Sequence, residues 1–594
     1  MTNYSDTILQ RRRLAILILG LAIFGVVLGV RLFYLQVWQH GKYLAEAISE
    51  HTHKYDIPAR RGELYVHDGD GRSPVALNQQ LNVLYADPSY ISAKARTTVA
   101  QQLAAATGAK AADYQHQIET AAAAGSQYVV LADRLSNDLA AKIKALNLAG
   151  VGLTQHDYRT YPEGTLAAQV LGFVNASDQG QYGIEQYLND RLAGQPGRLA
   201  AKTDTRGIPI ATADNVQQAP VDGQSYVLTI DRNIQAMVES ELAKQVQAVH
   251  AASGGVIVMD PASGAIRAMA SYPTFNPNAY SKTTDYSVFL NQAADVQFEP
   301  GSGMKVFTMA AGLDQGKVTP DTTYDDPGCY HIDDRNVCNA EGDKPGPNKT
   351  MTAVLKDSLN TGVMFVLRKL GADPDKFTLA GKQLLYNYFT QHFGFGERTG
   401  IEQANEVAGA VNQASNAAGN DVNYANMSFG QGVSVTMVQM VAAMGAIANG
   451  GKLWQPHLVD ARLSADGTAT PVAPKLVRDH VISQQADQQL NQMLEVVARH
   501  GSGWRIYENG KNQGYNIAGK TGTAQIPKPD GTGYIEGANV GSFTGYAPAE
   551  SPKFVVMVRI DRPGVDGYAE TTTVPVFGDI CSWLFRYYGI PPSS

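Results

Sequence analysis

The hydrophobic pattern begins with one long apolar segment near the start of the chain. Residues 14–30 form a run of 17 uncharged, mostly apolar residues, and after Arg31 the apolar character continues to Leu35. A helix needs ~20 such residues to cross a bilayer core of about 30 Å, and an arginine near its end can reach the interface. The sequence therefore predicts one membrane-spanning helix over residues 14–37.

The residues that flank this segment predict its orientation. Three arginines at 11–13 precede it, and Tyr34 and Trp38 at its end suit a membrane interface. The positive-inside rule then places residues 1–13 in the cytoplasm and the bulk of the chain outside, in the periplasm. A cleaved signal peptide is the alternative, but its apolar region is usually shorter and ends in small residues. Because no second apolar run approaches spanning length, we expect a single-pass protein of the cytoplasmic (inner) membrane.

Residues 38–221 show a mixed, irregular pattern. Residues 97–147 are rich in Ala and Gln and predict helix, and residues 183–192 predict an amphipathic helix. Nothing in this segment combines a nucleophile, a base and a group that orients the base. We interpret it as an elongated α/β pedestal that acts as a spacer or an interaction module.

A different pattern begins near residue 222. A β-rich run at 226–230 is followed by Asp231, a suitable N-cap for a helix that starts near Asn233. A hairpin follows, with strands at 255–259 and 265–269, and then a long helical insert. Three strand-like runs come after the insert, at 515–525, 540–547 and 553–561, and a closing helix covers 572–588. This order predicts an α+β domain over residues 222–594, with one antiparallel sheet flanked by helices.

Composition narrows the function classes. A chain of 594 residues with 44% hydrophobic and 17% charged residues is an ordinary globular protein of two or more domains. Its net charge of -7, without a basic run that carries aromatics, gives no reason to expect nucleic-acid binding. No Cys/His cluster has metal spacing and no glycine-rich run matches a phosphate loop, so we expect neither metal nor cofactor. Cys329 and Cys338 are close enough to clip one loop, but their spacing leaves open whether they form a disulfide.

Candidate chemistry first arises in the helical insert, at Glu299-Pro-Gly-Ser-Gly-Met-Lys305. If a helix starts here, Ser302 and Lys305 share a face, and the lysine amine can reach the serine hydroxyl. A serine attacks acyl groups when a base lies beside it, and a lysine becomes that base when burial and nearby charge lower its pKa. Alone the pair is weak, since a surface helix often carries both residue types.

Two later motifs change this interpretation. Ser358-Leu-Asn360 offers a second hydroxyl for proton transfer and an amide for a peptide backbone, though by itself it is a common pattern. Lys520-Thr-Gly-Thr523 lies in the strand-like run 515–525, where a glycine usually marks close approach by another backbone or a ligand. A solvated edge strand is the alternative for this motif taken alone. All three together, in this order, form the set found in penicillin-binding proteins and class A β-lactamases.

The sequence resembles the class B penicillin-binding proteins, which are monofunctional D,D-transpeptidases, over nearly its whole length. The resemblance rests on the apolar anchor and on motifs in both halves, Arg60-Arg61-Gly62, Tyr161-Pro-Glu-Gly164, Leu171-Gly-Phe-Val174, Gly183-Ile-Glu185, Glu299-Pro-Gly-Ser302, Met427-Ser-Phe-Gly-Gln-Gly432, Ile447-Ala-Asn-Gly-Gly451 and Phe543-Thr-Gly-Tyr-Ala-Pro548. The last groups are most similar to the cell-division (septal) branch, with the elongation branch as the alternative. The implied fold is a serine β-lactamase-like transpeptidase domain, with a five-stranded antiparallel sheet, after a pedestal of the dimerisation type.

The resemblance also implies a role for each motif residue. Ser302 is expected to be acylated by the penultimate D-Ala carbonyl of a stem peptide, with Lys305 accepting its proton and Ser358 protonating the leaving amine. Asn360 is expected to bind the donor backbone, and the backbone N–H groups of Ser302 and Thr523 to form the oxyanion hole. The terminal carboxylate is expected to bind the strand motif, which comprises Lys520, Thr521, Gly522 and Thr523. An amine of a second stem peptide then attacks the acyl-enzyme, and β-lactams mimic the D-Ala-D-Ala end.

Two other functions share the scaffold. A serine β-lactamase needs a carboxylate that activates the deacylating water, and 487–491 (DQQLN) imitates such a motif but comes too late in the chain order. A non-catalytic β-lactam sensor or division scaffold would not need all three motifs intact. Because we find no glycosyltransferase segment, we expect the anchor and pedestal to bind division proteins, including a membrane glycan polymerase.

Overall fold

The structure is a computed structural model that describes residues 4–44, 52–202, 216–340, 342–528, 530, 533–564 and 567–593. The chain divides into two compact units, Met1–Arg60 with Gly194–Asp222, and Arg61–Ala193 with Gly223–Ser594.

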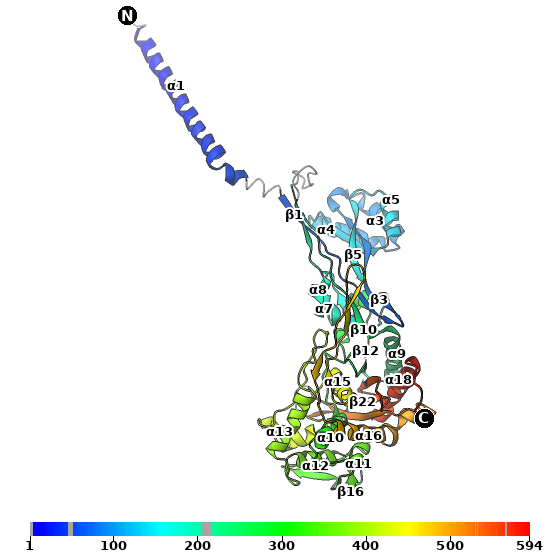
Figure 1. The fold of residues 1–594 in the computed structure, drawn as a ribbon. Helices are drawn as coiled ribbons and strands as arrows, with labels where there is room; N and C mark the ends of the chain where they lie inside the picture. The colour runs from blue at the N-terminus through cyan, green and yellow to red at the C-terminus, as the bar shows by residue number, and fades with distance from the viewer. Residues whose placement is uncertain are drawn as a thin grey trace. The chain divides into compact units, whose positions relative to one another are not determined.

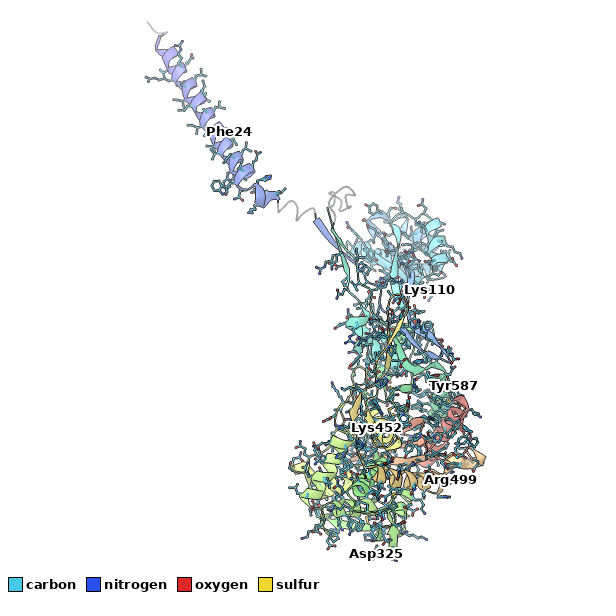
Figure 2. The ribbon with its side chains drawn as sticks, in the orientation of Figure 1. Phe24, Lys110, Asp325, Lys452, Arg499 and Tyr587 are labelled. Atoms are coloured by element: carbon cyan, nitrogen blue, oxygen red, sulfur yellow. A yellow bond between two sulfur atoms is a disulfide. The ribbon has the colours of Figure 1, made fainter. Side chains whose placement is uncertain are left out.

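The first unit contains the apolar helix and a small sheet. Helix α1 (Tyr4–Phe33) continues into a π-helical turn, η1 (Tyr34–Trp38), and the segment Leu9–Trp38 is long and apolar enough to cross a membrane. Its apolar side chains, such as Phe24, point outward from the helix (Figure 2). The predicted span over 14–37 lies within this segment. The sheet is antiparallel and contains β1 (Thr52–Ile57), β8 (Gly197–Lys202) and β9 (Val216–Gln218).

The second unit begins with the pedestal sheet. Its path runs in the order β19-β18-β10-β2-β3-β4, and β5 pairs with β3. The strands are β2 (Leu64–Asp68), β3 (Gly71–Ala86), β4 (Val129–Leu135), β5 (Val151–Thr160), β10 (Ser225–Asp231), β18 (Val459–Leu463) and β19 (Ala469–Pro471). Strand β10 pairs with both β2 and β18, so this sheet takes strands from both sides of the boundary predicted at residue 221. The domain boundary at residue 221 thus does not separate two sheets, and the domain ranges drawn from the sequence stay predictions.

Two pedestal segments differ from the elements expected of them. Segment 97–147 contains three helices, α3 (Arg96–Thr107), α4 (Ala111–Ala123) and α5 (Asn137–Ala145), but β4 interrupts them. The β-branched run at 129–130 pairs with β3, and this pairing overrides the helical character of the flanks. Segment 183–192 is two short helices, α7 (Gly183–Tyr187) and α8 (Asn189–Leu192), because the backbone leaves the helical conformation at Leu188.

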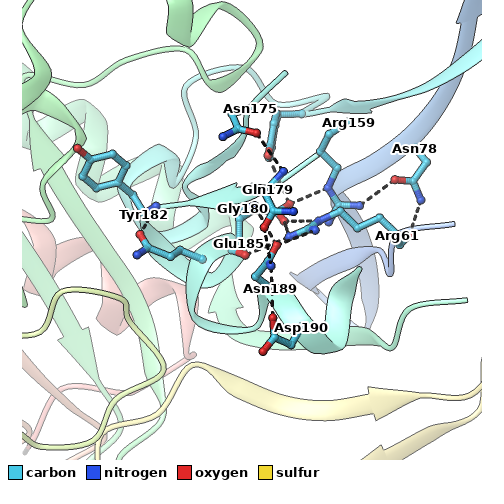
Figure 3. A network of polar contacts seen from close by, with 12 residues as sticks. Arg61, Asn78, Arg159, Asn175, Gln179, Gly180, Tyr182, Glu185, Asn189 and Asp190 are labelled. Atoms are coloured by element: carbon cyan, nitrogen blue, oxygen red, sulfur yellow. Dashed lines mark hydrogen bonds and ion pairs between the residues drawn. The ribbon is translucent and has the colours of Figure 1, made fainter. Parts of the chain in front are cut away.

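A buried ion network joins three parts of the pedestal (Figure 3). Glu185 of α7 is fully buried, and its carboxylate accepts from Arg61 Nε at 2.8 Å and from Arg159 Nε of β5 at 2.7 Å. Asn189 accepts from Arg61 at 3.1 Å, and Asn78 of β3 accepts from Arg159 at 3.2 Å. Burial alone would raise the pKa of Glu185, but the charges and hydrogen bonds of the two arginines hold it below its usual value. The carboxylate is therefore charged, and it fixes α7 against β5 and the start of β2.

The α+β domain contains the predicted five-stranded antiparallel sheet, in the order β12-β11-β23-β22-β21. Figure 1 labels two of its strands, β12 and β22. The strands are β11 (Ser253–Met259), β12 (Ile266–Tyr272), β21 (Ala518–Pro527), β22 (Tyr534–Ala547) and β23 (Phe554–Asp561). Asp231 caps α9 (Arg232–Ala248) by accepting from the N–H groups of Asn233 and Ile234, as expected. The closing helical segment is α17 (Ala569–Thr572) followed by α18 (Val574–Tyr587).

Helices cover both faces of this sheet. On one face α9 packs against β11 and β12, and α18 packs against β22 and β23, in a cluster that includes the alternating side chains Val556 and Val558. On the other face lie α15 (Met437–Ala448), α10 (Lys305–Asp314) and α16 (Gln484–His500). Helix α15 is buried on every side, because it packs against the sheet and within the helical insert. Strand β21 forms one edge of the sheet, so part of its backbone remains free to pair with a ligand.

The Glu185 network generates a stability prediction. We expect Glu185→Gln to lower the free energy of unfolding by about 3–5 kcal/mol, because two buried guanidinium groups lose their counter-charge. Urea unfolding of the detergent-solubilised full-length protein, followed by circular dichroism, measures this loss. The control is Glu163→Gln, which breaks a partly exposed pair with Arg232 and should cost about 0–1 kcal/mol. Equal losses in the two variants would contradict the prediction.

Candidate active site

The turn that carries Ser302 is a short 3₁₀ helix, η5 (Gly301–Met304), which continues directly into α10. Residues three apart eclipse one another in a 3₁₀ turn, so Ser302 and Lys305 lie on the same side. The Ser302 side chain is partly exposed, and its hydroxyl has no hydrogen-bond partner within the described part of the chain. The Lys305 side chain is buried, with a relative exposure of 1%. The spacing expected from the sequence is therefore realised by a tighter helix than an α-helix.

Close backbone approach brings this turn against β21. Gly301 has φ +52°, and a Cβ built on it would lie 2.3 Å from the carbonyl oxygen of Thr523. A Cβ on Gly522 would lie 2.4 Å from the carbonyl oxygen of Pro300. No residue with a side chain fits at either position without displacement, which explains the glycine in mid-strand. Because the Thr523 carbonyl faces this turn, the N–H of the same residue also points away from β22.

The three motifs meet at the side chain of Ser358. Lys305 Nζ donates to Ser358 Oγ at 3.2 Å and also to the carbonyl oxygen of Ser358. Lys520 Nζ donates to the same Oγ at 3.0 Å. A serine hydroxyl has two lone pairs and one proton, so with both lysines donating its proton is free for a third partner. This arrangement joins residues that are 53 and 162 positions apart in sequence.

Burial and mutual repulsion determine the charges of the two lysines. Burial lowers the pKa of Lys305 well below its usual value, the charge of Lys520 lowers it further, and Asp343 partly opposes both. Burial lowers the pKa of Lys520 to about 7, against the opposing charge of Glu570. Near neutral pH the site therefore favours a neutral amine at Lys305 and leaves Lys520 close to its own titration. A neutral Lys305 is a base placed beside the Ser302 turn.

The hydroxyl groups of β21 are held by their neighbours. Thr521 Oγ1 accepts from Lys520 Nζ at 3.1 Å and lies 2.6 Å from the hydroxyl of Ser502. Thr523 Oγ1 accepts from the backbone N–H of Ala569 at 3.4 Å. Each threonine oxygen thus receives a hydrogen bond from the protein, so its own proton can be donated to a ligand. Donors of this kind beside a lysine suit a carboxylate.

The amide of Asn360 contacts the hairpin that contains the two cysteines. Cys329 and Cys338 form a disulfide between the facing strands β14 (Cys329–Ile332) and β15 (Arg335–Cys338), which settles the alternative that the sequence left open. Asn360 Nδ2 donates to the Cys338 carbonyl oxygen at 2.8 Å. Asn360 Oδ1 has no hydrogen bond within the described residues.

A cleft with a volume of about 840 Å³ runs over these groups. It is lined by five of the residues predicted from the sequence, Ser302, Ser358, Asn360, Thr521 and Thr523. Lys305 and Lys520 lie buried beside it, and Gly522 forms the contact with the Ser302 turn.

The cleft also contains residues that the sequence patterns did not indicate, namely Asp343, His500, Ser502, Tyr568 and Glu570. None belongs to a spaced motif. Ser502 and Glu570 reach the cleft from the loop after α16 and from α17, so no signal in the sequence identified them before the fold was known.

Comparisons with known proteins identify the family of this chain. The penicillin binding protein transpeptidase domain matches residues 254–582, and the penicillin-binding protein dimerisation domain matches residues 56–228. Stage V sporulation protein D of Bacillus subtilis is 31% identical, covering 99% of this chain and 87% of the relative. Peptidoglycan D,D-transpeptidase FtsI of Escherichia coli is 28% identical, covering 95% and 90%. Penicillin binding protein 3 of Mycobacterium tuberculosis, solved with aztreonam, has a TM-score of 0.67 at 26% identity, covering 91% of this chain and 98% of that one.

The chain therefore belongs to the class B penicillin-binding proteins, as the resemblance of its motifs indicated. The transpeptidase match includes every motif residue from Ser302 to Thr523.

Proposed function

We propose that the Ser302 cleft cross-links peptidoglycan stem peptides by serine acyl transfer, as a D,D-transpeptidase. The observation that supports this most directly is the convergence of Lys305 and Lys520 on the hydroxyl of Ser358, beside the Ser302 turn. A base, a proton relay and a cation in one cleft are the groups that acyl transfer from an anionic peptide needs. Similar proteins named peptidoglycan D,D-transpeptidase add support.

Acylation starts from neutral Lys305. The amine takes the proton of Ser302 Oγ as the oxygen attacks the carbonyl carbon of the penultimate D-Ala. The negative charge that develops on the carbonyl oxygen is bound by the N–H groups of Ser302 and Thr523, which lie on the two backbones that meet at Gly301. The proton passes from Lys305 through Ser358 to the departing nitrogen, the C–N bond breaks, and D-Ala leaves.

The terminal carboxylate of the donor supplies recognition. Lys520 provides the positive charge, and Thr521 and Thr523, whose oxygens already accept from the protein, can each donate a hydroxyl proton. Asn360 binds the donor backbone through its amide. A bound carboxylate favours the charged form of Lys520 and so raises the low pKa that burial gives it. Substrate binding therefore restores the cation that the site needs.

The second half-reaction releases the serine. An amine of a neighbouring stem peptide attacks the Ser302 ester, a new amide bond forms, and the ester C–O bond breaks. The surplus proton of the amine moves through Ser358 and Lys305 to Ser302 Oγ. The enzyme returns to its starting state with the cross-link made.

A hydrolase is a weaker alternative. Asp487 lines a separate pocket together with Asn491, and Asn491 is held by Tyr546 and the Ala549 carbonyl. Burial raises the pKa of Asp487 to about 7, but this carboxyl group is not in the lining of the Ser302 cleft as far as the structure describes it. The carboxylate that would activate water in a β-lactamase is therefore not supplied by 487–491.

Covalent labelling tests the nucleophile. We expect a fluorescent penicillin to label the full-length protein, and the adduct to map by mass spectrometry to the peptide that contains Ser302. Ser302→Ala should abolish labelling, because it removes the hydroxyl that is proposed to attack the β-lactam carbonyl. Ser502→Ala is the matched control, since it removes a cleft hydroxyl but leaves the nucleophile. Undiminished labelling of Ser302→Ala would refute the assignment.

The lysine charges predict a pH dependence. The second-order rate constant of acylation reports the free enzyme, and it should fall as pH rises through about 7 and Lys520 loses its proton. Glu570→Gln removes a negative charge that raises the Lys520 pKa, so this fall should begin at lower pH. Glu550→Gln, a carboxylate outside the cleft, should leave the profile unchanged. An unshifted profile in Glu570→Gln would contradict the electrostatic assignment.

We infer that this transpeptidase acts in the synthesis of the septal cell wall. The anchor would hold the enzyme in the inner membrane with its cleft in the periplasm, where the anchor and pedestal bind division proteins and a membrane glycan polymerase. The apolar segment Leu9–Trp38 and the similarity to FtsI support this proposal, while similarity to a sporulation protein keeps related wall-building roles open.

An anchor exchange tests the partnership. Replacing residues 14–37 with an unrelated membrane helix should reduce co-purification of the polymerase while penicillin labelling stays normal, because the cleft is untouched. Recovery of the polymerase in full yield would count against a role for the anchor.

A further inference from the structure

The segment that carries Ser358 and Asn360 is held in an unusual conformation. Ser358 has φ +58°, a region that non-glycine residues rarely adopt, and its carbonyl and hydroxyl both contact Lys305. Helix α12 (Asn360–Leu370) begins two residues later, and its N-cap residue, Leu359, makes no side-chain cap. An uncapped helix start beside a strained residue needs support from elsewhere.

That support comes from the disulfide hairpin and the strand before it. Asn339, directly after Cys338, accepts from the backbone N–H of Thr361 at 2.9 Å, which is the kind of bond that a helix cap normally makes. The neighbouring Cys338 carbonyl accepts from Asn360 at 2.8 Å. The hairpin therefore caps α12 from a distant part of the sequence.

Asp326 completes this cap. It lies at the end of β13 (Thr323–Asp326), is 4% exposed, and accepts from Asn339 Nδ2 at 3.0 Å and from Thr361 Oγ1 at 2.7 Å. Asp326 also accepts from the N–H of Gly328 at 2.9 Å. Its carboxylate therefore receives hydrogen bonds from Asn339, Thr361 and Gly328. Asn339 accepts from Thr361 with Oδ1 and donates to Asp326 with Nδ2. If either side chain of the Asp326–Asn339 pair is changed alone, two donors or two acceptors face one another.

We propose that Asp326 and Asn339 are positioning residues for the reaction: they fix the start of α12, and through it place the Ser358 hydroxyl and the Asn360 amide in the cleft. The inference rests on the proposed function, since it concerns the geometry of the same reaction. Neither residue touches the reacting atoms. Their effect passes through Thr361 and the backbone between 358 and 361.

Exchanging the two side chains tests this proposal. Asp326→Asn makes a new NH₂ group face the amide of Asn339, and Asn339→Asp makes two carboxylates face one another. The double variant combines both substitutions and reverses the polarity of the pair. The amide then present at position 326 donates to the carboxylate then present at position 339, and that carboxylate can still accept from Thr361.

The readout is the rate at which a fluorescent penicillin acylates the full-length protein. We expect each single change to slow acylation about tenfold, because one buried hydrogen bond of the cap is lost and the Ser358 segment shifts. The double change should restore the rate to within about threefold of the parent.

The rate constant and the final extent of labelling separate positioning from folding. If a variant merely misfolds, a smaller fraction of its molecules is labelled, but those molecules react at the parent rate. If Ser358 is displaced, the molecules that become labelled react with a lower rate constant. Asp325→Asn is the matched control on the outward face of β13 (Figure 2), and Asn336→Asp is the control on the hairpin. Both should label at the parent rate.

Two results would overturn the inference: single variants that acylate at the parent rate, or a double variant slower than either single one. Failure of the proposed function looks different, because then the parent itself is not labelled at Ser302.

Discussion

Two buried ammonium groups that share one hydroxyl as a hydrogen-bond partner repel one another, and burial disfavours the charge of each. Lys305 and Lys520 both contact Ser358 Oγ, and burial together with their mutual repulsion disfavours the doubly charged state. The chemistry proposed for the cleft depends on this conflict, because one lysine must be a base and the other a cation. The neighbouring carboxylates reach the pair from different segments, Asp343 toward Lys305 and Glu570 toward Lys520.

The fold places these groups through a few rigid contacts. Strand β21 is fixed by its pairing with β22, and the glycines at 301 and 522 allow the nucleophile turn to lie directly against it. Helix α10 brings Lys305 into the core below the turn, and α12 follows directly on the Ser358 segment. The site is therefore assembled where three separate elements meet, and each one is anchored by buried apolar packing.

Local pattern predicted much of this architecture. The Asp231 cap, the hairpin of β11 and β12, and the late strands follow from short-range signals, and each of the three motifs contributes residues to the lining of one cleft. Strand pairing between distant segments could not be predicted from the local pattern, as β4 shows: it interrupts a segment with helical composition because it pairs with β3. The break of residues 183–192 into two helices was not predicted either. Ser502, Asp343 and Glu570 enter the cleft through tertiary contacts alone, which no periodicity encodes. The disulfide likewise depends on strands β14 and β15 facing one another.

The edge position of β21 has a consequence for what can enter the cleft. An unpaired strand edge accepts extended chains of many sequences through main-chain bonds, and in many proteins it is a route to unwanted association. Here η5 lies against this strand at Gly522, and the start of α17 donates to Thr523. Because these elements border the edge of β21, the open part of the edge suits a slender, extended oligopeptide better than a long strand of another folded protein. The size and shape of a ligand therefore limit its access to β21, independently of its side chains.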